Sequence, residues 1–360
     1  MNNRFTERFG VELPLIQAPM AGASDVELAV AVSEAGGLGS LPCAMLNGDQ
    51  VRTAWRAIRQ RTPRPVNLNF FCHPVAAKNE ARERQWEERL RGYYAELGID
   101  SSAGAAVPNR NPFDDAMCDA VVELKPEIVS FHFGLPDGRL LERVRSAGCR
   151  VLACATTVEE ARWLESRGCD GIVAQGFEAG GHRGMFLAAD TATQIGTIAL
   201  VPQVADAVRV PVIAAGGIAD ARGIAAAFAL GASAVQIGTA YLCCPESRAS
   251  AVHRQAIASA KDDGTVLTNV ITGRPARGIV NRLIREVGPM AESAPQFPNA
   301  FTAVAPLRAE AERLGSGDFS PLWAGQASSM CRNVPAGELT RQLMRETQEL
   351  LARLAADHTA

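Results

Sequence analysis

The sequence lacks the features that would place the chain in a membrane, on nucleic acid or around a metal ion. Its longest apolar runs, such as Ala225–Leu230, are far shorter than the roughly 20 residues needed to span a bilayer. Lys and Arg (36) do not outnumber Asp and Glu (39), so no basic excess is available to neutralise phosphates. The nine cysteines include no CxxC pair, and Cys243 and Cys244 are adjacent, which excludes zinc-ligand spacing. We therefore expect no metal, no membrane and no nucleic-acid partner.

Two further absences bear on location. The polar residues 1–12 contain no apolar core of a signal peptide. An odd number of cysteines fits reduced thiols better than a disulfide framework. Both observations predict a cytoplasmic protein, and the composition leaves a monomer or a homodimer open.

Short apolar segments recur along the chain at the intervals expected of alternating strands and helices. Ile128, Val151 and Ile172 follow one another at spacings of 23 and 21 residues. The segments are apolar on both faces, which is typical of parallel strands covered by helices. Eight of them are present, at 15–18, 37–41, 66–70, 128–133, 151–155, 171–175, 212–215 and 234–237. Eight such units predict a (β/α)8 TIM barrel in the α/β class, with a doubly wound sheet as the alternative.

Two segments, 72–120 and 240–330, interrupt this repeat. A charged stretch in the first carries apolar side chains at helical spacing, which predicts a helix packed on the barrel with a solvated outer face. We expect both segments to form a smaller helical domain over the barrel mouth. The barrel then comprises 1–71 and 121–239, and regularly spaced leucines predict a C-terminal helix, 337–356, that closes its wall.

Glycine-rich turns follow the last two strands, where many barrels bind a phosphate group. Gly216, Gly217 and Gly238 would let the backbone approach an anion, and Thr239 offers a hydroxyl donor. The amides at the start of the helix that follows the first turn are expected to point at the same anion. Asp220 is placed to cap the helix that follows the first turn. The alternative is a pair of tight turns required only for packing.

Polar and apolar groups are also expected at the ends of other strands. After strand one, Pro19 fixes the path of the loop, so that Ala18 and Met20 could face a planar ring; a plain β–α turn explains this segment equally well. Asn69, on the same strand face as Asn67, and Gln175 end strands three and six with amides. Amides at corresponding positions favour ligand binding.

Two of the five histidines are predicted to face the barrel mouth. His182 lies in the loop Gly176–Gly184, which contains four glycines and begins a long insertion after strand six. A histidine there can act as acid, base or hydrogen-bond donor near neutral pH. His132 ends strand four, where a structural and a functional role are both open. His73 and His253 are assigned to loops or the surface.

These residues together resemble a known family. The segment 17–22, the loop Gly176–Gly184 and the turn 236–239 are similar to those of the nitronate monooxygenases of the bacterial class I type, formerly called 2-nitropropane dioxygenases. The similarity extends over roughly 10–330, and Leu322–Gln326 resembles the C-terminal motif of the family.

The resemblance implies a TIM barrel that binds FMN and oxidises alkyl nitronates, such as propionate 3-nitronate. O2 would convert this small anionic substrate to a carbonyl compound and nitrite through a flavin semiquinone. His182 would be the active-site histidine. The resemblance and the turns described above give the expected FMN contacts as Ala18, Pro19, Met20, Asn69, Gln175, Gly180, Gly181, Gly216, Gly217, Gln236, Ile237, Gly238 and Thr239.

The chain departs from the family at the substrate side. Some bacterial members place tyrosines and a lysine from the C-terminal segment near the flavin. This chain has three tyrosines in all, the last at Tyr241, and no lysine after Lys261. We therefore assign His132 and Trp323 to substrate binding in their place.

Two other functions remain open at this point. One is an NAD(P)H-dependent flavin reductase of a quinone or an enoyl thioester on the same scaffold. The absence of a GxGxxG motif after a strand argues against it. The other is a barrel that only binds a phosphorylated ligand, against which the histidine in the glycine-rich loop is the main argument.

Overall fold

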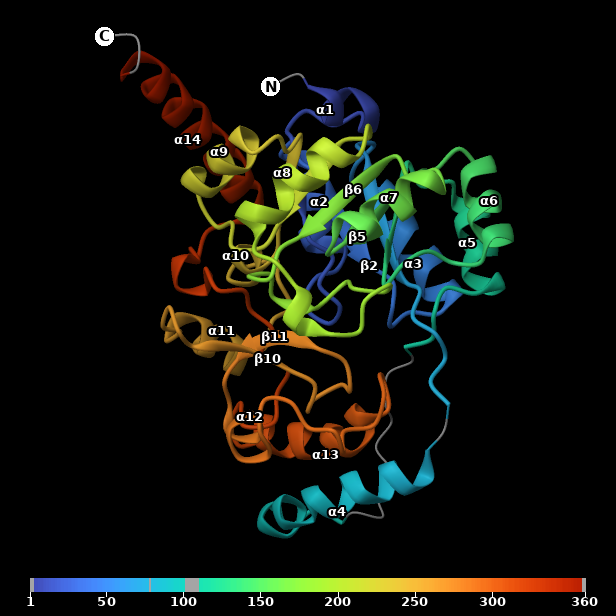
Figure 1. Cartoon of the computed structure of the whole chain (residues 1–360), viewed down its shortest axis with the longest axis vertical. Coiled ribbons are helices and arrows are strands. Elements are labelled where there is room, and N and C mark those ends of the chain that lie inside the picture. The colour runs from blue at the N-terminus through green and yellow to red at the C-terminus, as the bar shows by residue number, and fades with distance from the viewer. Residues whose placement is uncertain (1–2, 78, 101–109, 358–360) are drawn as a thin grey trace.

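Eight parallel strands form the centre of the molecule (Figure 1). The computed structural model describes residues 3–77, 79–100 and 110–357. Each strand is short and almost entirely buried, because helices cover its outer face and neighbouring strands fill the inside. The strands are β1 (Leu15–Gln17), β2 (Gly39–Pro42), β3 (Val66–Phe71), β4 (Ile128–His132), β5 (Arg150–Ala155), β6 (Gly171–Gln175), β8 (Val212–Ala215) and β9 (Ala234–Ile237).

The sheet closes on itself. Its strand order is β1-β9-β8-β6-β5-β4-β3-β2, and the two end strands meet at a bridge between Ile16 and Leu38. The Gln17 N–H donates to the Leu38 carbonyl over 2.9 Å, and the Leu38 N–H donates to the Leu15 carbonyl over 2.8 Å. An open doubly wound sheet has no such contact between its edges. The predicted (β/α)8 barrel is therefore confirmed.

Eight helices surround the barrel. Seven follow strands in the alternating pattern, and the C-terminal helix takes the eighth place by packing against the first and the seventh of them. This last helix matches the one predicted at 337–356. The eight are α2 (Val26–Glu34), α3 (Gly48–Arg59), α5 (Asp115–Leu124), α6 (Gly138–Ser146), α7 (Val158–Ser166), α8 (Thr197–Ala207), α9 (Ala221–Ala229) and α14 (Ala336–Asp357).

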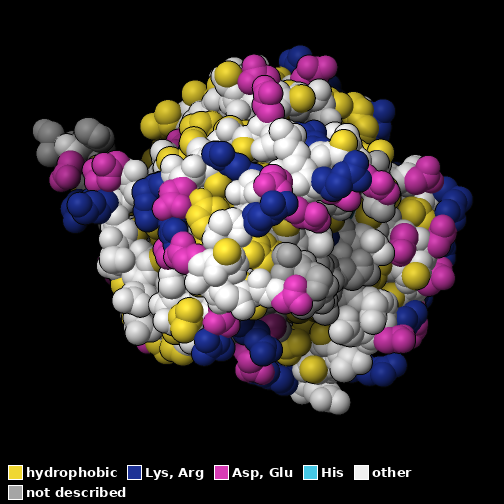
Figure 2. Space-filling model, turned by 90° about the horizontal axis from the view of Figure 1, so that it is seen from below, with side chains coloured by type: hydrophobic (Ala, Val, Ile, Leu, Met, Phe, Trp, Pro, Cys, Tyr) yellow, Lys and Arg dark blue, Asp and Glu magenta, His cyan; other side chains and the backbone are white. Residues whose placement is uncertain are grey.

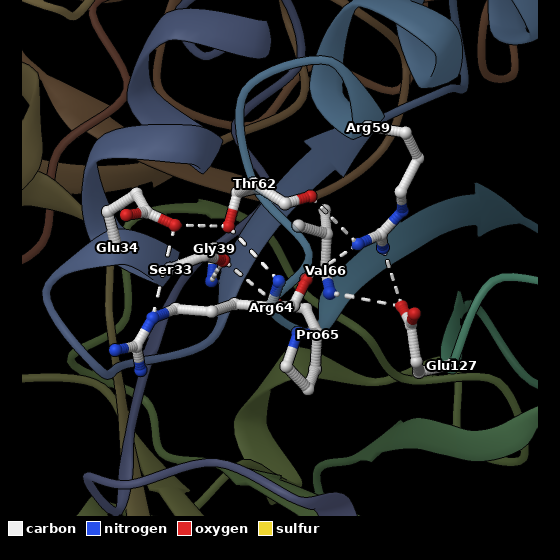
Figure 3. A network of polar contacts seen from close by, with 9 residues as sticks. All are labelled: Ser33, Glu34, Gly39, Arg59, Thr62, Arg64, Pro65, Val66 and Glu127. Carbon is white, nitrogen blue, oxygen red and sulfur yellow. Dashed lines mark hydrogen bonds and ion pairs between the residues drawn. The ribbon is translucent and has the colours of Figure 1, made fainter.

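The N-terminal end of the barrel is held by packing and by polar contacts. Helix α1 (Arg4–Phe9) packs Phe5 and Phe9 against inward-facing strand residues. Figure 3 shows a polar network around the residues that precede β3 and β4, where the Arg59 guanidinium donates to the carbonyl of Arg64 over 2.7 Å and to Glu127 over 2.6 Å. Residues at this end of a TIM barrel serve stability, whereas the chemistry lies at the opposite end.

A second apolar core lies over the barrel mouth. Helix α4 (Glu80–Leu97) packs against α13 (Ala300–Arg313): the Trp86 indole N–H donates to the Ala300 carbonyl and the Tyr94 hydroxyl to the Ala303 carbonyl, over 3.2 and 2.7 Å. Figure 1 shows α4 at the far end of the molecule from the barrel, below α13. The expectation that this helix packs on the barrel is therefore wrong.

The two predicted cover segments differ from the structure in two other details. Helix α5 packs on α3 and α6 of the barrel, although residues up to 120 were assigned to the cover. The cover also contains strands: β10 (Thr265–Thr268) and β11 (Ala276–Ile279) pair antiparallel, and β7 (Gly181–His182) adds to them. Its remaining elements are α10 (Thr239–Leu242), α11 (Ala251–Ala258), α12 (Arg282–Val287) and the short 3-10 turn Ser328–Met330, while the turn Thr191–Thr193 belongs to the loop before α8.

The surface of the cover is mixed in charge. Seen from the end at which α4 lies, Lys and Arg side chains alternate with Asp and Glu (Figure 2). Among the described helices, none combines the length and the apolar character required to cross a membrane.

Candidate active site

A cavity of about 300 Å³ lies at the carboxyl ends of the barrel strands, where the cover faces the mouth. Its volume is at the lower end of the range for small-molecule sites, about 300 to 1,000 Å³. It brings together all but one of the predicted site residues: Ala18, Pro19, Met20, Asn69, His132, Gln175, Gly180, Gly181, His182, Gly216, Gly217, Gln236, Gly238, Thr239 and Trp323.

Ile237 is the predicted residue that does not line the cavity. Its side chain is buried in the barrel wall, and its carbonyl accepts a hydrogen bond from the Ala18 N–H over 2.8 Å. It therefore holds the first loop in place from behind. Asn67 also lies outside the lining and donates to the Ser40 hydroxyl over 3.0 Å, whereas Asn69, one pleat further on, reaches the cavity.

The turn after β8 has the shape of an anion site. Gly216 and Gly217 have φ angles of 113° and 71°, which L side chains rarely adopt. A Cβ at Gly216 would lie 2.9 Å from the Ala179 nitrogen. Within the described residues, the N–H groups of Gly217 and Thr239 donate to no other group of the chain. Free amides beside a backbone that tolerates no side chain suit a phosphate group.

The helix that follows this turn does not contribute in the expected way. The Asp220 carboxylate caps α9, as predicted, by accepting from the N–H groups of Arg222 and Gly223 over 3.0 and 3.3 Å. The same carboxylate therefore occupies the amides that were expected to face a ligand. The turns at 216–218 and 238–239, rather than the start of α9, are the groups available to an anion.

The glycine-rich loop is ordered by buried side chains at its base. The Gln175 amide donates to the His182 carbonyl over 3.1 Å and accepts from the Gly184 N–H over 2.8 Å. Arg183, with no exposed surface, donates to the carbonyls of Gln175 and Gly176. Gln175 thus serves to position the loop, although it also lines the cavity. Sequence reasoning missed Arg183, because an arginine in a glycine-rich loop gives no signal of burial.

His182 is fixed by the cover. It lies on β7 opposite Ala276 of β11, and its Nε2 atom is 2.9 Å from the hydroxyl of the buried Thr272. Burial lowers the pKa of His182 well below its ordinary value of 6.5, and the charge of Arg110 adds to this shift. The imidazole is therefore neutral in the free protein. It can donate one hydrogen bond and accept another, and an anion bound beside it would raise its pKa.

His132 lines the cavity and also contacts the backbone of His182. Its Nε2 atom is 3.2 Å from the His182 carbonyl, which requires the proton on that nitrogen. Burial lowers the pKa of His132 to about 4, so this ring is neutral as well. The side chain lines the cavity and also holds the backbone of His182. Trp323 stands on the cover side, with its ring centre 5.4 Å from that of His182.

The structure adds residues that the sequence did not reveal. Arg110 lines the cavity and lies over the Phe301 ring, with its guanidinium carbon 4.7 Å from the ring centre. It makes no ion pair within the described residues, and the stretch 101–109 contains no Asp or Glu. Arg308 lines the same side but pairs with Glu312 over 2.8 Å. Arg110 is therefore the positive charge available to a ligand.

The burial of His253 shows that one prediction was wrong. It was assigned with His73 to loops or the surface, but both are buried, with 8% and 4% of their surfaces exposed. His253 lies on α11, lines the cavity and has its Nε2 atom 3.0 Å from the Trp323 carbonyl. Neither Arg110 nor His253 follows a strand or stands in a motif, so no local signal in the sequence marks it.

Four histidines, two buried and two half-buried, make the stability of the fold dependent on pH. Burial lowers the pKa of His73, His132 and His253 to about 4, and that of His182 also falls well below 6.5. The unfolded chain binds these protons near pH 6.5 and the folded protein does not. Stability is therefore complete above that pH and falls below it, by about 1.4 kcal/mol per pH unit for each histidine.

Urea denaturation at a series of pH values tests this expectation. We expect a free energy of unfolding that is flat above about pH 7.5 and falls steeply between about pH 6.5 and 4.5. The carboxylates with lowered pKa values, such as Glu27 and Asp115, add to the loss only below that window. A constant free energy from pH 8 to about 5 would contradict the neutral state of these rings.

A solved structure with the same architecture defines the class of protein. The nitroalkane oxidase from Streptomyces ansochromogenes superimposes with a TM-score of 0.89 at 38% identity, covering 98% of this chain and 100% of that one. FabK from Thermotoga maritima is less similar, with a TM-score of 0.75 and 28% identity over 99% of each chain. The barrel, its mouth and its cover are thus those of an oxidoreductase.

Sequence comparison gives the family. The model of the family "Nitronate monooxygenase" matches residues 2–346. The nitronate monooxygenases of Pseudomonas aeruginosa and Paraburkholderia phytofirmans are 43% and 42% identical, each over 96% of this chain and over 99% and 95% of their own. The chain belongs to the nitronate monooxygenase family, whose members are flavin-dependent enzymes.

Proposed function

We propose that the protein oxidises small anionic alkyl nitronates with O2 to a carbonyl compound and nitrite, with FMN as its cofactor. One observation carries this proposal: a single cavity joins a glycine turn suited to a phosphate to Arg110, a half-buried arginine without a carboxylate partner among the described residues. The first group fits the phosphate end of FMN, and the second fits an anionic substrate.

The residues around the cavity divide into two groups. The turns at 216–218 and 238–239 would hold the phosphate of FMN, with Thr239 as a hydroxyl donor. Asn69 and the wall formed by Ala18 and Met20 would face the ring system at the barrel mouth. When bound, the flavin supplies the electron transfer from the nitronate and the reaction with O2. The protein supplies orientation, exclusion of water and electrostatic stabilisation.

Arg110 and His182 would bind the nitronate. The guanidinium would place a permanent positive charge beside the nitronate oxygens, in a site where partial burial strengthens the attraction. The imidazole, oriented by the contact with Thr272, adds a hydrogen-bond donor without adding charge. Trp323 limits the space opposite the ring of His182.

The neutral imidazole also indicates which form of the substrate is oxidised. A base whose pKa is well below 6.5 removes a carbon-bound proton poorly at neutral pH. A nitronate has already lost that proton, whereas the parent nitroalkane has not. We therefore propose that nitronates are oxidised much faster than the neutral nitroalkanes.

A spectrum and two assays test the function. We expect a yellow protein that releases nitrite from propionate 3-nitronate and ethylnitronate in the presence of O2. A colourless protein that binds no flavin would favour a barrel that only binds a phosphorylated ligand. Rapid anaerobic bleaching by NADH, with no nitrite formed from either nitronate, would favour the reductase.

Replacement of Arg110 by glutamine tests the substrate charge. Removing a buried charge partner of an anion costs about 2 to 5 kcal/mol, so we expect kcat/KM for nitronates to fall by a factor of at least about 30. Arg162→Gln, on the exposed face of α7, is the matched control and should leave kcat/KM unchanged. An unchanged kcat/KM in Arg110→Gln, with flavin still bound, would remove Arg110 from the site.

A further inference from the structure

Two cysteines meet on the outer side of the cavity wall. Cys243 ends α10, and Cys331 follows the turn Ser328–Met330, which packs against that helix. The Cys331 Sγ atom lies 3.4 Å from the carbonyl of Thr239, which begins α10 one helical turn before Cys243, so the fold brings the two thiols next to each other. Both side chains are partly exposed, so that small oxidants in solution can reach the pair.

The pair is connected directly to the second anion-binding turn. The Cys331 thiol is 3.4 Å from the Thr239 carbonyl, and the Gly325 N–H donates to the Thr239 hydroxyl over 3.0 Å. Thr239 and Gly325 line the cavity, whereas the two cysteines do not. The thiols therefore hold the turn from behind, without occupying the space for a ligand.

Cys243 differs from the other thiols in its chemistry. Interaction with the neighbouring Cys331 thiol lowers the pKa of Cys243 to about 7, and the charge of Arg254 assists. The same contact raises the pKa of Cys331. Burial raises the pKa of the seven remaining thiols: Cys43, Cys72, Cys118, Cys149, Cys154, Cys169 and Cys244. A thiolate is the reactive form of cysteine, and Cys243 has its resolving partner in contact.

We propose that Cys243 and Cys331 form a dithiol that hydrogen peroxide converts to a disulfide, which joins α10 to the segment 325–331 behind the anion-binding turn. The Cys243 thiolate attacks one peroxide oxygen, the O–O bond breaks, and a sulfenic acid and hydroxide result. The Cys331 sulfur then displaces the hydroxyl group, forming the S–S bond and releasing water. Overall, two thiols and one peroxide yield one disulfide and two waters.

Oxidation changes the wall of the cavity in two ways. The disulfide removes the S–H group that Cys331 offers to the Thr239 carbonyl, and it ties together two segments that are otherwise held by hydrogen bonds. The site, the turn and the oxidant do not depend on which substrate the enzyme uses. Formation of the disulfide can therefore be tested whether or not the protein oxidises nitronates.

Peptide mapping of the full-length holoprotein tests the proposal. The reduced protein is treated with hydrogen peroxide in increasing amounts, the free thiols are blocked, and tryptic peptides are analysed by mass. We expect a cross-linked pair of peptides, 223–248 with 314–332, lighter by two hydrogen atoms than their sum, to form before any other thiol is oxidised. A reductant should restore both peptides.

Two variants give the controls. In Cys331→Ser, peroxide should leave Cys243 as a sulfenic acid that a dimedone reagent traps, and no cross-link should form. In Cys149→Ser, which removes a buried thiol of the barrel wall, the cross-link should form as in the unmodified protein. Earlier oxidation of other thiols, a bond between Cys243 and Cys244 instead, or no reaction at either residue would each overturn the proposal.

Discussion

Replacement of His182 by asparagine is expected to lower kcat/KM for nitronates by about 10²- to 10³-fold, the usual loss when one oriented donor is removed from a reacting anion. The imidazole is held by β7 and by the Thr272 hydroxyl, 2.9 Å from its Nε2 atom. The shorter asparagine side chain cannot make that contact and reach the substrate at once. Because the ring is neutral, its loss removes a hydrogen bond rather than a charge.

Two measurements separate this effect from damage to the fold. The flavin absorbance and Tm of His182→Asn should match those of the unmodified protein, because the loop is fixed by Gln175 and Arg183 through backbone atoms. Thr272→Val should show a smaller loss of kcat/KM, since it frees the ring without removing it. Turnover by His182→Asn at the unmodified rate would exclude His182 from the reaction.

Replacement of Gly216 by alanine is expected to yield a protein that loses FMN. The added Cβ would lie 2.9 Å from the Ala179 nitrogen and 3.1 Å from the Thr197 hydroxyl, at a φ of 113° that alanine rarely adopts. The turn must shift to relieve this contact, and its free amides shift with it. A loss of about 1.4 to 3 kcal/mol in binding raises the Kd of FMN by about 10- to 150-fold.

Gly92 provides the matched control for this substitution. It lies on the exposed face of α4, and a Cβ there would meet no atom within 4 Å. Gly92→Ala should retain flavin fully and, because alanine favours a helix, should raise stability by up to about 1 kcal/mol. Flavin titration of the two apoproteins is the measurement. Equal Kd values would show that the phosphate does not lie on the turn at 216–217.

The barrel was predictable because each of its units carries a local signal. Strands such as 171–175, 212–215 and 234–237 have the bounds expected from runs of small and β-branched residues, since both of their faces are covered. The carboxyl ends of parallel strands meet at one end of a barrel, so residues that end strands could be placed in one site without any contact information. Gln175 and His132 are of this kind.

The cover was less predictable because its contacts join segments distant in the sequence. The periodic apolar side chains of α4 show that this helix has a buried face, but not that α13 covers it. His182 illustrates the same limit, since the strand β7 exists only by pairing with β11. Arg110 is the clearest example. It lines the cavity, but no residue near it in the sequence predicts that position.

The barrel, the glycine turns and the histidine loop could be predicted from the sequence, because apolar periodicity and the ends of strands depend on residues that are close together in the chain. The distribution of charge in the site became clear only from the tertiary structure. Burial makes His182 neutral and leaves Arg110 as the positive group, and the cap by Asp220 directs an anion to the turns instead of to α9. Burial and partner choice are long-range properties, fixed only when distant segments meet. A chain without an excess of basic residues thus still presents the positive charge of Arg110 to the cavity, and the cysteines without metal spacing include a pair that only the fold brings together.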